Sequence, residues 1–329
     1  MLMRAVTAPN PGGPEVLTVV EHPDPQPGDD ELLVRVEAAG VNRADVLQRS
    51  GHYPPPPGAS DVLGLEVAGT VVTVGADAGE RWQAGDRVCA VLAGGGYAEL
   101  ACVPASTALP WPHGLDAVGA AAVPEVFATV YDNVVRRGGL KTGETVLFHG
   151  GSSGIGTAGV QVARRMGCTV LVTAGSRDKL AACTALGADA GINYREESFR
   201  ERVKELTSGR GVDVILDIVG APYLDDNLRS LATEGRLVII GLMGGASADI
   251  DLGRMLGRRL AVMASTLRAR SVAEKADLAR ALEEAVWPGF ADGSLRPVVD
   301  RTFPLEEAAA AHARMESSEH IGKIVLTMT

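Results

Sequence analysis

The chain has 329 residues, of which 46% are hydrophobic and 22% charged, and its formal net charge is −10. This composition is typical of a folded globular protein and not of a disordered one. Since nucleic acids and anionic membranes are normally bound by a surplus of Lys and Arg, the composition argues against both kinds of partner.

Targeting and cysteine patterns point to the cytoplasm. Met1–Pro14 lacks the apolar segment of a signal peptide, and no apolar run reaches the length of a membrane span. The cysteines Cys89, Cys102, Cys168 and Cys183 form neither a C-x-x-C pair nor a zinc pattern. We therefore expect reduced, buried thiols in a cytoplasmic protein with no membrane partner.

Residues 1–110 contain short apolar runs separated by Gly and Pro, a pattern that predicts a mostly-β, barrel-like domain. One short helix is expected over Asn42–Arg49, with Asn42 as its N-cap.

From Thr145 onward, apolar segments typical of buried strands start at intervals of 20 to 24 residues. These segments are Thr145–His149, Thr169–Ala174, Asp189–Asn193, Asp213–Asp217, Arg236–Ile240 and Leu260–Ala264. Helical patterns lie between them, at Ser176–Leu186, Glu197–Thr207 and Tyr223–Leu231. Strands alternating with helices predict an α/β fold with a doubly wound parallel sheet.

The last part of the chain has a different pattern. It predicts the helix Val272–Val286, the strand Val298–Phe303, the helix Leu305–Met315 and the strand Lys323–Thr327. We expect this tail to return to the first domain. The predicted division is 1–122 and 267–329 for the mostly-β domain and 123–266 for the α/β domain.

The first strand-to-helix turn of the α/β domain has the features of a dinucleotide-binding turn. Residues 150–156 read Gly-Gly-Ser-Ser-Gly-Ile-Gly, a G-x-x-G-x-G pattern, and the helix that follows starts without an acidic residue. Bare N–H groups and the positive end of the helix dipole favour a pyrophosphate there. A tight turn that needs small residues is the alternative. For the Ser152-Ser153 pair we expect phosphate contact and no nucleophilic role, because no G-x-S-x-G surrounds it.

The end of the second strand suggests the choice of cofactor. An NAD site usually places Asp or Glu at this position, but here the chain reads Gly175-Ser176-Arg177-Asp178-Lys179. Ser176 is a good N-cap, whereas Arg177 and Lys179 fall in the first helical turn, where the dipole disfavours cations. The 2′-phosphate of NADPH would resolve this mismatch. Two solvated cations, partly neutralised by Asp178, are the alternative.

Three histidines are possible catalytic bases, but the sequence favours structural roles for them. His149 ends the first strand of the α/β domain, and a packed or hydrogen-bonded ring is expected there. His312 and His320 lie in the tail, where the sequence indicates no partner.

Short segments along nearly the whole chain resemble the zinc-free quinone oxidoreductases of the medium-chain dehydrogenase/reductase superfamily, the relatives of zeta-crystallin. The tumour-suppressor-induced branch is the most similar. The matching segments are Val41–Asp45, Gly51–Gly58, Leu63–Glu66, Val172–Ser176, Gly241–Gly245 and Ile321–Val325.

The same resemblance bears on zinc. Alcohol dehydrogenases of the superfamily bind a catalytic zinc through a Cys near the position of Asn42 and a His at the position of Leu65. Leucine cannot bind zinc, and the cysteine-rich structural zinc lobe is replaced by a short connection. The resemblance therefore implies a metal-free enzyme that reduces an easily reduced acceptor, such as a quinone or an activated enone.

The resemblance also implies a GroES-like catalytic domain, a Rossmann domain and NADPH in the cleft between them. Ser153 and Gly154 would approach the pyrophosphate. Gly175, Ser176, Lys179 and Tyr194 would hold the 2′-phosphate end. The nicotinamide side would be lined by Gly241, Leu242, Met243, Thr266 and Leu267, and Thr129 and Lys323 would complete the cofactor shell.

Asn42 and Tyr53 would lie near the position of hydride transfer, with Asn42 also touching the cofactor. For Tyr194 an ordinary strand-edge tyrosine is the alternative, and for Tyr53 a rigid surface loop.

The leading function is NADPH-dependent reduction of quinones, in which positioning does most of the catalytic work. Reduction of the C=C bond in alkenals or enones is a second reading, and a non-catalytic NADPH-binding structural or sensor protein is a third. By the family pattern we expect a homodimer formed through the edge of the Rossmann sheet.

Overall fold

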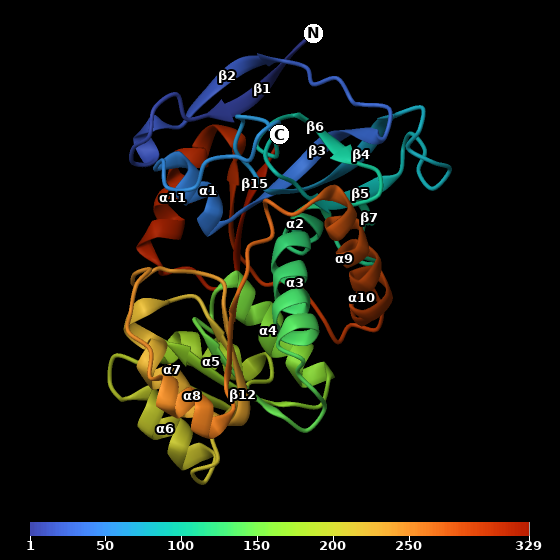
Figure 1. Cartoon of the computed structure of the whole chain (residues 1–329). Helices are drawn as coiled ribbons and strands as arrows, with labels where there is room; N and C mark the ends of the chain where they lie inside the picture. The colour runs from blue at the N-terminus through green and yellow to red at the C-terminus, as the bar shows by residue number, and fades with distance from the viewer. Residues whose placement is uncertain (329) are drawn as a thin grey trace. The chain divides into compact units, whose positions relative to one another are not determined.

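The computed structural model describes residues 1–328, and the chain divides into two compact units. Unit 1 comprises Met1–Ala128 and the chain from Leu267 onward, and unit 2 comprises Thr129–Thr266. Figure 1 follows the chain through both units by colour. The predicted first boundary lies after residue 122, whereas the observed division follows Ala128. No helix within residues 1–328 is long and apolar enough to cross a bilayer.

Unit 1 is built on a seven-stranded sheet whose strand order is β14-β15-β3-β4-β5-β7, with β6 also paired to β3. The strands are β3 (Glu31–Val41), β4 (Glu66–Val74), β5 (Arg87–Val91), β6 (Leu100–Pro104), β7 (Leu109–Pro110), β14 (Val299–Pro304) and β15 (Lys323–Thr327). β15 runs antiparallel to β3, with Ile324 opposite Val41. In Figure 1 the red C-terminal strand accordingly lies beside the blue β3. The tail thus completes the sheet that the N-terminal half begins.

The remaining elements of unit 1 cover this sheet or extend from it. A separate antiparallel pair is formed by β1 (Leu2–Thr7) and β2 (Thr18–Pro23). The helices are α1 (Arg43–Arg49), α2 (Ala117–Ala121), α3 (Pro124–Val130), α9 (Val272–Ala285), α10 (Trp287–Ala291) and α11 (Ala308–Ser317), with short 3-10 turns at Pro14–Val16 and Leu305–Glu307. α3 crosses the division between the units and continues into a π-helical segment, Tyr131–Arg137.

Unit 2 is a six-stranded parallel sheet in the order β10-β9-β8-β11-β12-β13, so the predicted Rossmann-type α/β fold is confirmed. Its strands are β8 (Thr145–His149), β9 (Thr169–Ala174), β10 (Ala190–Asn193), β11 (Val212–Asp217), β12 (Leu231–Ile239) and β13 (Ala261–Ala264). Its helices are α4 (Gly154–Arg165), α5 (Arg177–Ala185), α6 (Phe199–Leu206), α7 (Leu224–Ser230) and α8 (Leu252–Arg258), with a 3-10 turn at Ala221–Tyr223.

One strand differs from the prediction. β12 begins at Leu231, which the sequence had assigned to the end of a helix, and not at Arg236. Leu231 pairs with Val212 and Arg236 pairs with Val214, so the intervening residues form an irregularity in the ladder. Within it Glu234 has a φ of 65°, a left-handed conformation that glutamate rarely adopts and that the sequence therefore does not predict.

Each unit has its own hydrophobic core. In unit 1 the alternating residues Leu32, Val34 and Val36 of β3 are buried, as expected for a strand with one face on a core. In unit 2 the strands β8, β9 and β11 are buried along nearly their whole length, and Leu147 and Ile215 belong to its cluster.

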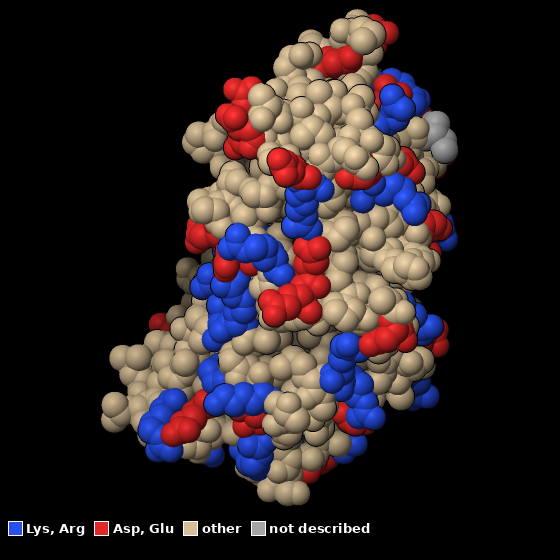
Figure 2. Space-filling view, turned by 90° about the vertical axis from the view of Figure 1, so that its right-hand side faces the viewer, with Lys and Arg blue, Asp and Glu red and all other residues tan. Residues whose placement is uncertain are grey.

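The molecular face in Figure 2 carries both signs of charge. Lys and Arg occur there in separate groups, most of them beside Asp or Glu, and no continuous basic stripe crosses this face. The view is in keeping with the acidic balance of the sequence.

Candidate functional site

The turn between β8 and α4 is shaped to accept an anion. Ser153 is the N-cap of α4, and its Oγ accepts a hydrogen bond from the Gly156 N–H at 3.1 Å. The next N–H groups, of Gly154 and Ile155, are in the first turn of the helix and have no intrahelical acceptor. The first turn of α4 contains no acidic residue, as the sequence indicated. A helix start of this kind can accept an anion, and pyrophosphate binding by Ser153 and Gly154 stays a prediction.

The glycines of this turn are required by close approach. A Cβ at Gly156 would lie 2.4 Å from the carbonyl oxygens of Gly150 and Gly151. Gly159, one helical turn further on, was not predicted, and a Cβ there would lie 2.4 Å from the Phe148 ring. The two positions bring the backbone of α4 against its own turn and against β8. Counting forward from Gly156 by helical spacing could have found the second one.

A second candidate subsite lies where β9 ends and α5 begins. Ser176 is the N-cap of α5, as predicted, and its Oγ accepts from the Lys179 N–H at 3.4 Å. A Cβ on Gly175 would lie 2.7 Å from the Tyr194 hydroxyl and 3.1 Å from the Arg195 Nε. The structure thus brings together Gly175, Ser176, Lys179 and Tyr194, which the sequence predicted as one group.

Arg195 was missed in the sequence analysis. It follows Tyr194 at the end of β10, and both side chains are exposed. With Arg177 and Lys179 it adds a third cation near the end of β9. Its position in the sequence could have indicated it, because Arg195 directly follows Tyr194, which was predicted to bind the 2′-phosphate.

The loop after β12 lies against the loop after β11. The Met243 N–H donates to the Ile218 carbonyl at 3.2 Å, and a Cβ on Gly241 would lie 2.9 Å from the same oxygen. The side chains of Leu242 and Met243 are each 54% exposed. These residues therefore line the edge of unit 2 where the parallel strands end, which is where ligands of such sheets bind.

The remaining predicted cofactor contacts lie at the ends of unit 2 or just beyond. Thr129 is buried at the end of α3, and its carbonyl accepts from the Asn133 side chain at 2.9 Å. Thr266 is exposed, and Leu267, the first residue of the returning chain, is partly buried. Their roles stay predictions.

His149 is a structural residue of this sheet edge, as expected. Its ring is 2% exposed, with Nδ1 at 3.0 Å from Thr173 Oγ1 and Nε2 at 2.7 Å from Asn227 Oδ1. Asn227 in turn donates to Asp217 at 3.1 Å. Burial lowers the pKa of His149 to about 4, so the ring is neutral near neutral pH. It links β8, β9 and α7 and is not exposed as a base.

In unit 1, Asn42 belongs to a buried polar cluster with Glu66 and Lys323. Asn42 Oδ1 accepts from Lys323 Nζ at 2.6 Å, and its Nδ2 donates to Glu66 Oε1 at 3.0 Å. Lys323 Nζ also donates to Glu66 Oε1 and to the Val41 carbonyl. All three side chains are buried.

The hydrogen bonds of this cluster bear on whether Lys323 contacts the cofactor. Its ammonium group has three N–H bonds, and three protein oxygens accept them. The arrangement favours Lys323 as a residue that positions Asn42 over one that contacts the cofactor directly. The sequence analysis quoted Glu66 only as part of a matching segment, and its pairing with Lys323 was missed.

A buried hydrogen-bonded chain extends the cluster. Asp45 Oδ2 accepts from the Asn42 N–H at 2.8 Å and from the Tyr97 hydroxyl at 3.1 Å. His312 Nε2 lies 3.3 Å from that hydroxyl, and His312 Nδ1 lies 3.4 Å from Arg49 Nη1. Since arginine can only donate, Nδ1 accepts, and Nε2–H donates to Tyr97. The expectation that His312 lacks partners is therefore wrong, because its partners come from distant segments.

Burial determines the charge states along this chain. It raises the pKa of Asp45 from 3.8 to about 7, an effect that the bonds from Asn42 and Tyr97 only partly oppose. Burial, followed by the charge of Arg49, lowers the pKa of His312 to about 3. The histidine is thus a neutral connector, and Asp45 changes its protonation near neutral pH.

Tyr53 is held by a residue that the sequence analysis did not identify. Arg268, which is 5% exposed, donates from Nη1 to the Tyr53 carbonyl at 3.2 Å, and its guanidinium group lies 5.4 Å from the ring centre. Arg268 also donates to the Ala93 carbonyl at 2.8 Å and to Gln48 Oε1 at 2.7 Å. The ring of Tyr53 is half-buried, so its loop is anchored more firmly than a simple surface loop.

The residues at the two alcohol dehydrogenase ligand positions do not fit a zinc ion. The Asn42 side chain is committed to Lys323 and Glu66, and Leu65 is buried and apolar. Within residues 1–328 no group of three or more His, Cys, Asp or Glu side chains is arranged to hold a metal. We therefore derive no step through zinc.

Both the sequence and the structure are similar to those of known oxidoreductases. Residues 28–113 match the alcohol dehydrogenase GroES-like domain family, and residues 154–285 match the zinc-binding dehydrogenase family. Quinone oxidoreductase of Rattus norvegicus is 33% identical over 330 residues, covering 99% of this chain and 98% of the relative.

Solved structures agree with these matches. Escherichia coli quinone oxidoreductase complexed with NADPH has a TM-score of 0.88 and 32% identity, with 99% of this chain and 100% of that chain covered. An NAD-dependent alcohol dehydrogenase has a TM-score of 0.85 and 32% identity, with the same coverage.

Proposed function

The chain belongs to the quinone oxidoreductase family of the medium-chain dehydrogenase/reductase superfamily, and on that premise we propose that it reduces quinones with NADPH and without a metal ion. It is an NADPH-dependent oxidoreductase, and the proposal concerns its substrate and its independence of zinc. The observation that carries the choice of cofactor is the end of β9. There Tyr194 lies against Gly175, Ser176 caps the helix that carries Lys179, and no acidic residue stands at the strand end.

The residues of the two units have separate tasks in this proposal. NADPH supplies a hydride from its nicotinamide ring. In unit 2, Ser153 and Gly154 bind the pyrophosphate, while Ser176, Lys179 and Tyr194 bind the 2′-phosphate. In unit 1, Asn42 and Tyr53 border the reacting groups. The Asp45 chain and Lys323 hold Asn42, and Arg268 holds Tyr53. Rate enhancement then comes chiefly from positioning.

Cofactor choice is tested by Lys179→Ala. A charge-assisted contact to phosphate contributes about 1.5–3 kcal/mol, so loss of Lys179 should weaken NADPH binding by about 10- to 100-fold. NADH binding should hardly change, because NADH lacks the phosphate. Fluorescence titration of both cofactors measures this, with Lys141→Ala, an exposed lysine before β8, as the matched control. Equal weakening of both cofactors, or a wild type that prefers NADH, contradicts the assignment.

The substrate is tested by following NADPH absorbance across a panel of quinones and α,β-unsaturated aldehydes and ketones. We expect the quinones to give the higher kcat/KM. Faster turnover of the enones would favour C=C reduction instead. Binding of NADPH without turnover of any acceptor would favour a non-catalytic NADPH-binding protein.

Zinc independence has its own measurement. Leu65 and the committed Asn42 side chain support a protein that carries no stoichiometric zinc. Elemental analysis of purified protein should find far less than one zinc per chain, and chelators should leave turnover unchanged. About one zinc per chain, removed together with activity, would overturn this part of the proposal.

We further propose a homodimer formed through the β13 edge of the Rossmann sheet. β13 is the last strand of the sheet, and next to it in sequence α8 exposes Leu252 by 68% and Leu256 by 84%. Exposed leucines on one helix face beside a sheet edge are typical of an interface. Light scattering should show a dimer that Leu256→Glu converts to monomer. The control Leu206→Glu, at a less exposed leucine on α6, should remain dimeric.

A further inference from the structure

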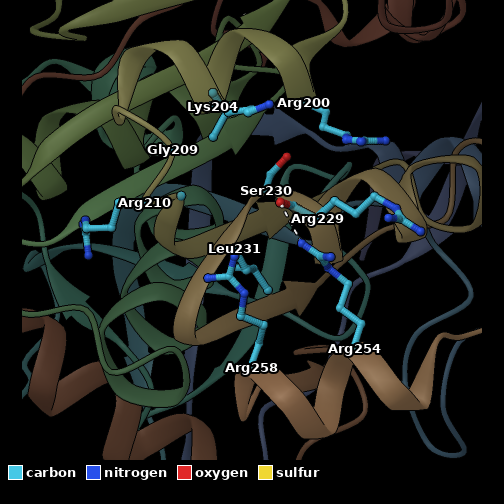
Figure 3. Close-up of a pocket in the computed structure, with 11 residues that line it drawn as sticks. Arg200, Lys204, Gly209, Arg210, Arg229, Ser230, Leu231, Arg254 and Arg258 are labelled. Atoms are coloured by element: carbon cyan, nitrogen blue, oxygen red, sulfur yellow. Dashed lines mark hydrogen bonds between the residues drawn. The ribbon is translucent and has the colours of Figure 1, made fainter.

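A basic pocket of about 200 Å³ lies in unit 2, away from the residues predicted to bind the cofactor. Its walls are the end of α6, the turn before β11, the end of α7, the start of β12 and α8 (Figure 3). None of its eleven lining residues is acidic. Six are basic: Arg200, Lys204, Arg210, Arg229, Arg254 and Arg258. In a chain with a net charge of −10, this is a pronounced local excess of positive charge.

Two of these cations are neutralised by neighbouring carboxylates. Arg210 donates to both oxygens of Asp213, at 2.8 and 2.6 Å, and Arg229 donates to Asp225 at 2.7 Å. In Figure 3 the head group of Arg210 is directed away from Arg254 and Arg258. Arg210 and Arg229 are thus the two pocket cations that are closely paired with carboxylates.

The positive charges of the other lining residues are not closely paired with carboxylates. Arg254 donates only to main-chain carbonyls at the end of α7, at 3.0 and 3.2 Å, and Arg258 donates to Thr233 at 3.3 Å. Within residues 1–328, neither Arg254, Arg258 nor Lys204 forms an ion pair with a carboxylate. Arg200 meets carboxylates only at 3.5 and 3.6 Å. Burial, and after it the charges of neighbouring arginines, lower the pKa of Arg254.

The position and size of the pocket separate it from the predicted cofactor site. The lining residues Gly211 and Leu231 stand at the starts of β11 and β12, whereas the cofactor turn follows the end of β8. Because the strands of the sheet are parallel, the pocket lies at their N-terminal ends and the cofactor turn at their C-terminal ends, on opposite sides of the same sheet. Pockets for drug-sized ligands measure about 300–1,000 Å³, so this one has room for a small anion and not for a dinucleotide.

We propose that the basic pocket binds a phosphate group, with Lys204, Arg254 and Arg258 as its ligands. Guanidinium groups match phosphate oxygens in geometry, and an ammonium group adds a point charge. A dianion would relieve the mutual repulsion of cations that no carboxylate neutralises. The phosphate can be a free anion or the end of a nucleotide, and the chemistry of recognition is the same for both.

The competing explanation is structural. Helices α6, α7 and α8 all end at this pocket, with Lys204, Arg229 and Arg258 in their last turns. Cations there stabilise the helices by opposing the negative end of the dipole. In that case the cations would stabilise the fold and bind no anion in a saturable way.

The test is calorimetric titration of the wild-type protein with inorganic pyrophosphate, inorganic phosphate and AMP, at an ionic strength held constant with chloride. Each titration is made with and without saturating NADPH, which blocks phosphate binding at the cofactor site. We expect saturable binding that persists with NADPH and weakens about tenfold or more in Lys204→Ala and in Arg258→Ala. Tighter binding of AMP than of free phosphate would identify a nucleotide as the source, and the reverse a free anion.

Arg202→Ala is the matched control, because Arg202 lies on α6, pairs with Glu205 at 2.8 Å and does not line the pocket. It should bind like the wild type. Heat denaturation shows whether each variant is folded, and Arg258→Gln provides a second variant if Arg258→Ala is not. Absence of saturable binding, loss of all binding with NADPH, or equal binding in the pocket variants and the control would overturn the proposal.

Discussion

Lys323 of unit 1 and Lys179 of unit 2 are both assigned to the site, but their surroundings differ. Lys323 is buried, and its ammonium donates to Glu66, Asn42 and the Val41 carbonyl. Lys179 lies partly exposed in the first turn of α5, where the helix dipole disfavours a cation. The charge of Lys323 is paired with Glu66 inside the protein, whereas Lys179 lies at the start of a helix, where a bound anion would be favourable.

The difference indicates what each unit provides. The polar groups of unit 1 bond one another in a buried network, which fixes the position of Asn42. In unit 2, Ser153 and Ser176 cap the starts of α4 and α5, where the helix dipole favours an anion. Substitutions in the first network should therefore act mainly on stability, and substitutions in the second mainly on binding.

The largest effect is expected for Lys323→Met. This change leaves Glu66 buried without its partner, which typically costs about 3–5 kcal/mol of stability. Urea unfolding followed by circular dichroism measures the loss, and Lys141→Met, at an exposed site, is the control. The double variant Glu66→Gln/Lys323→Met should recover most of it, because no charge is then buried alone. A loss as small as that of the control would show that the pair is not coupled.

The next effect is a pH dependence that Asp45→Asn should remove. Burial raises the folded-state pKa of Asp45 from 3.8 to about 7, so its protonated form is favoured in the folded protein. The resulting stability is present below about pH 4 and is lost as the pH rises through about 7, an effect of about 4 kcal/mol. The neutral amide keeps that stability, so the variant should become the more stable protein as the pH rises. Parallel pH profiles of the unfolding free energy would refute this assignment.

Substitutions of Asn42 and Tyr53 should lower turnover more than they weaken cofactor binding. We expect Asn42→Ala and Tyr53→Ala to lower kcat about tenfold, which corresponds to the loss of one positioned contact, with a smaller change in the NADPH dissociation constant. Tyr53→Phe keeps the ring against Arg268 and removes only the hydroxyl, so it separates the two parts of the side chain. Wild-type kinetics in all three variants would move the reacting groups elsewhere.

The smallest effect is expected for Arg195→Ala. The Arg195 side chain lies next to Gly175 but is exposed, so its contribution to 2′-phosphate binding should be about three- to tenfold in NADPH affinity. NADH affinity should stay unchanged, and Arg202→Ala on α6 is the control. If NADPH and NADH weaken together, Arg195 acts on the loop and not on the phosphate.

Most of unit 2 could be predicted from local sequence. Strands at near-constant spacing, the N-cap residues Ser153 and Ser176, and the glycines of the first turn all act within a few residues of one another. Such features are determined by periodicity, capping and steric fit, which operate along the chain. The misplaced start of β12 is the exception, because Glu234 adopts a positive φ inside an irregular ladder.

By itself, the sequence determined the α/β class, the Rossmann strand series, the glycine-rich turn before α4 and the cations at the start of α5. Only the tertiary structure decided what surrounds Asn42 and Tyr53. Glu66 and Lys323 are 257 positions apart, and Arg268 reaches Tyr53 across 215 positions. Pairing of β15 with β3 brings Lys323 to Asn42, and burial then shifts the pKa of Asp45 and of His312 in opposite directions. Burial and long-range pairing depend on the whole fold, so no local pattern reports them.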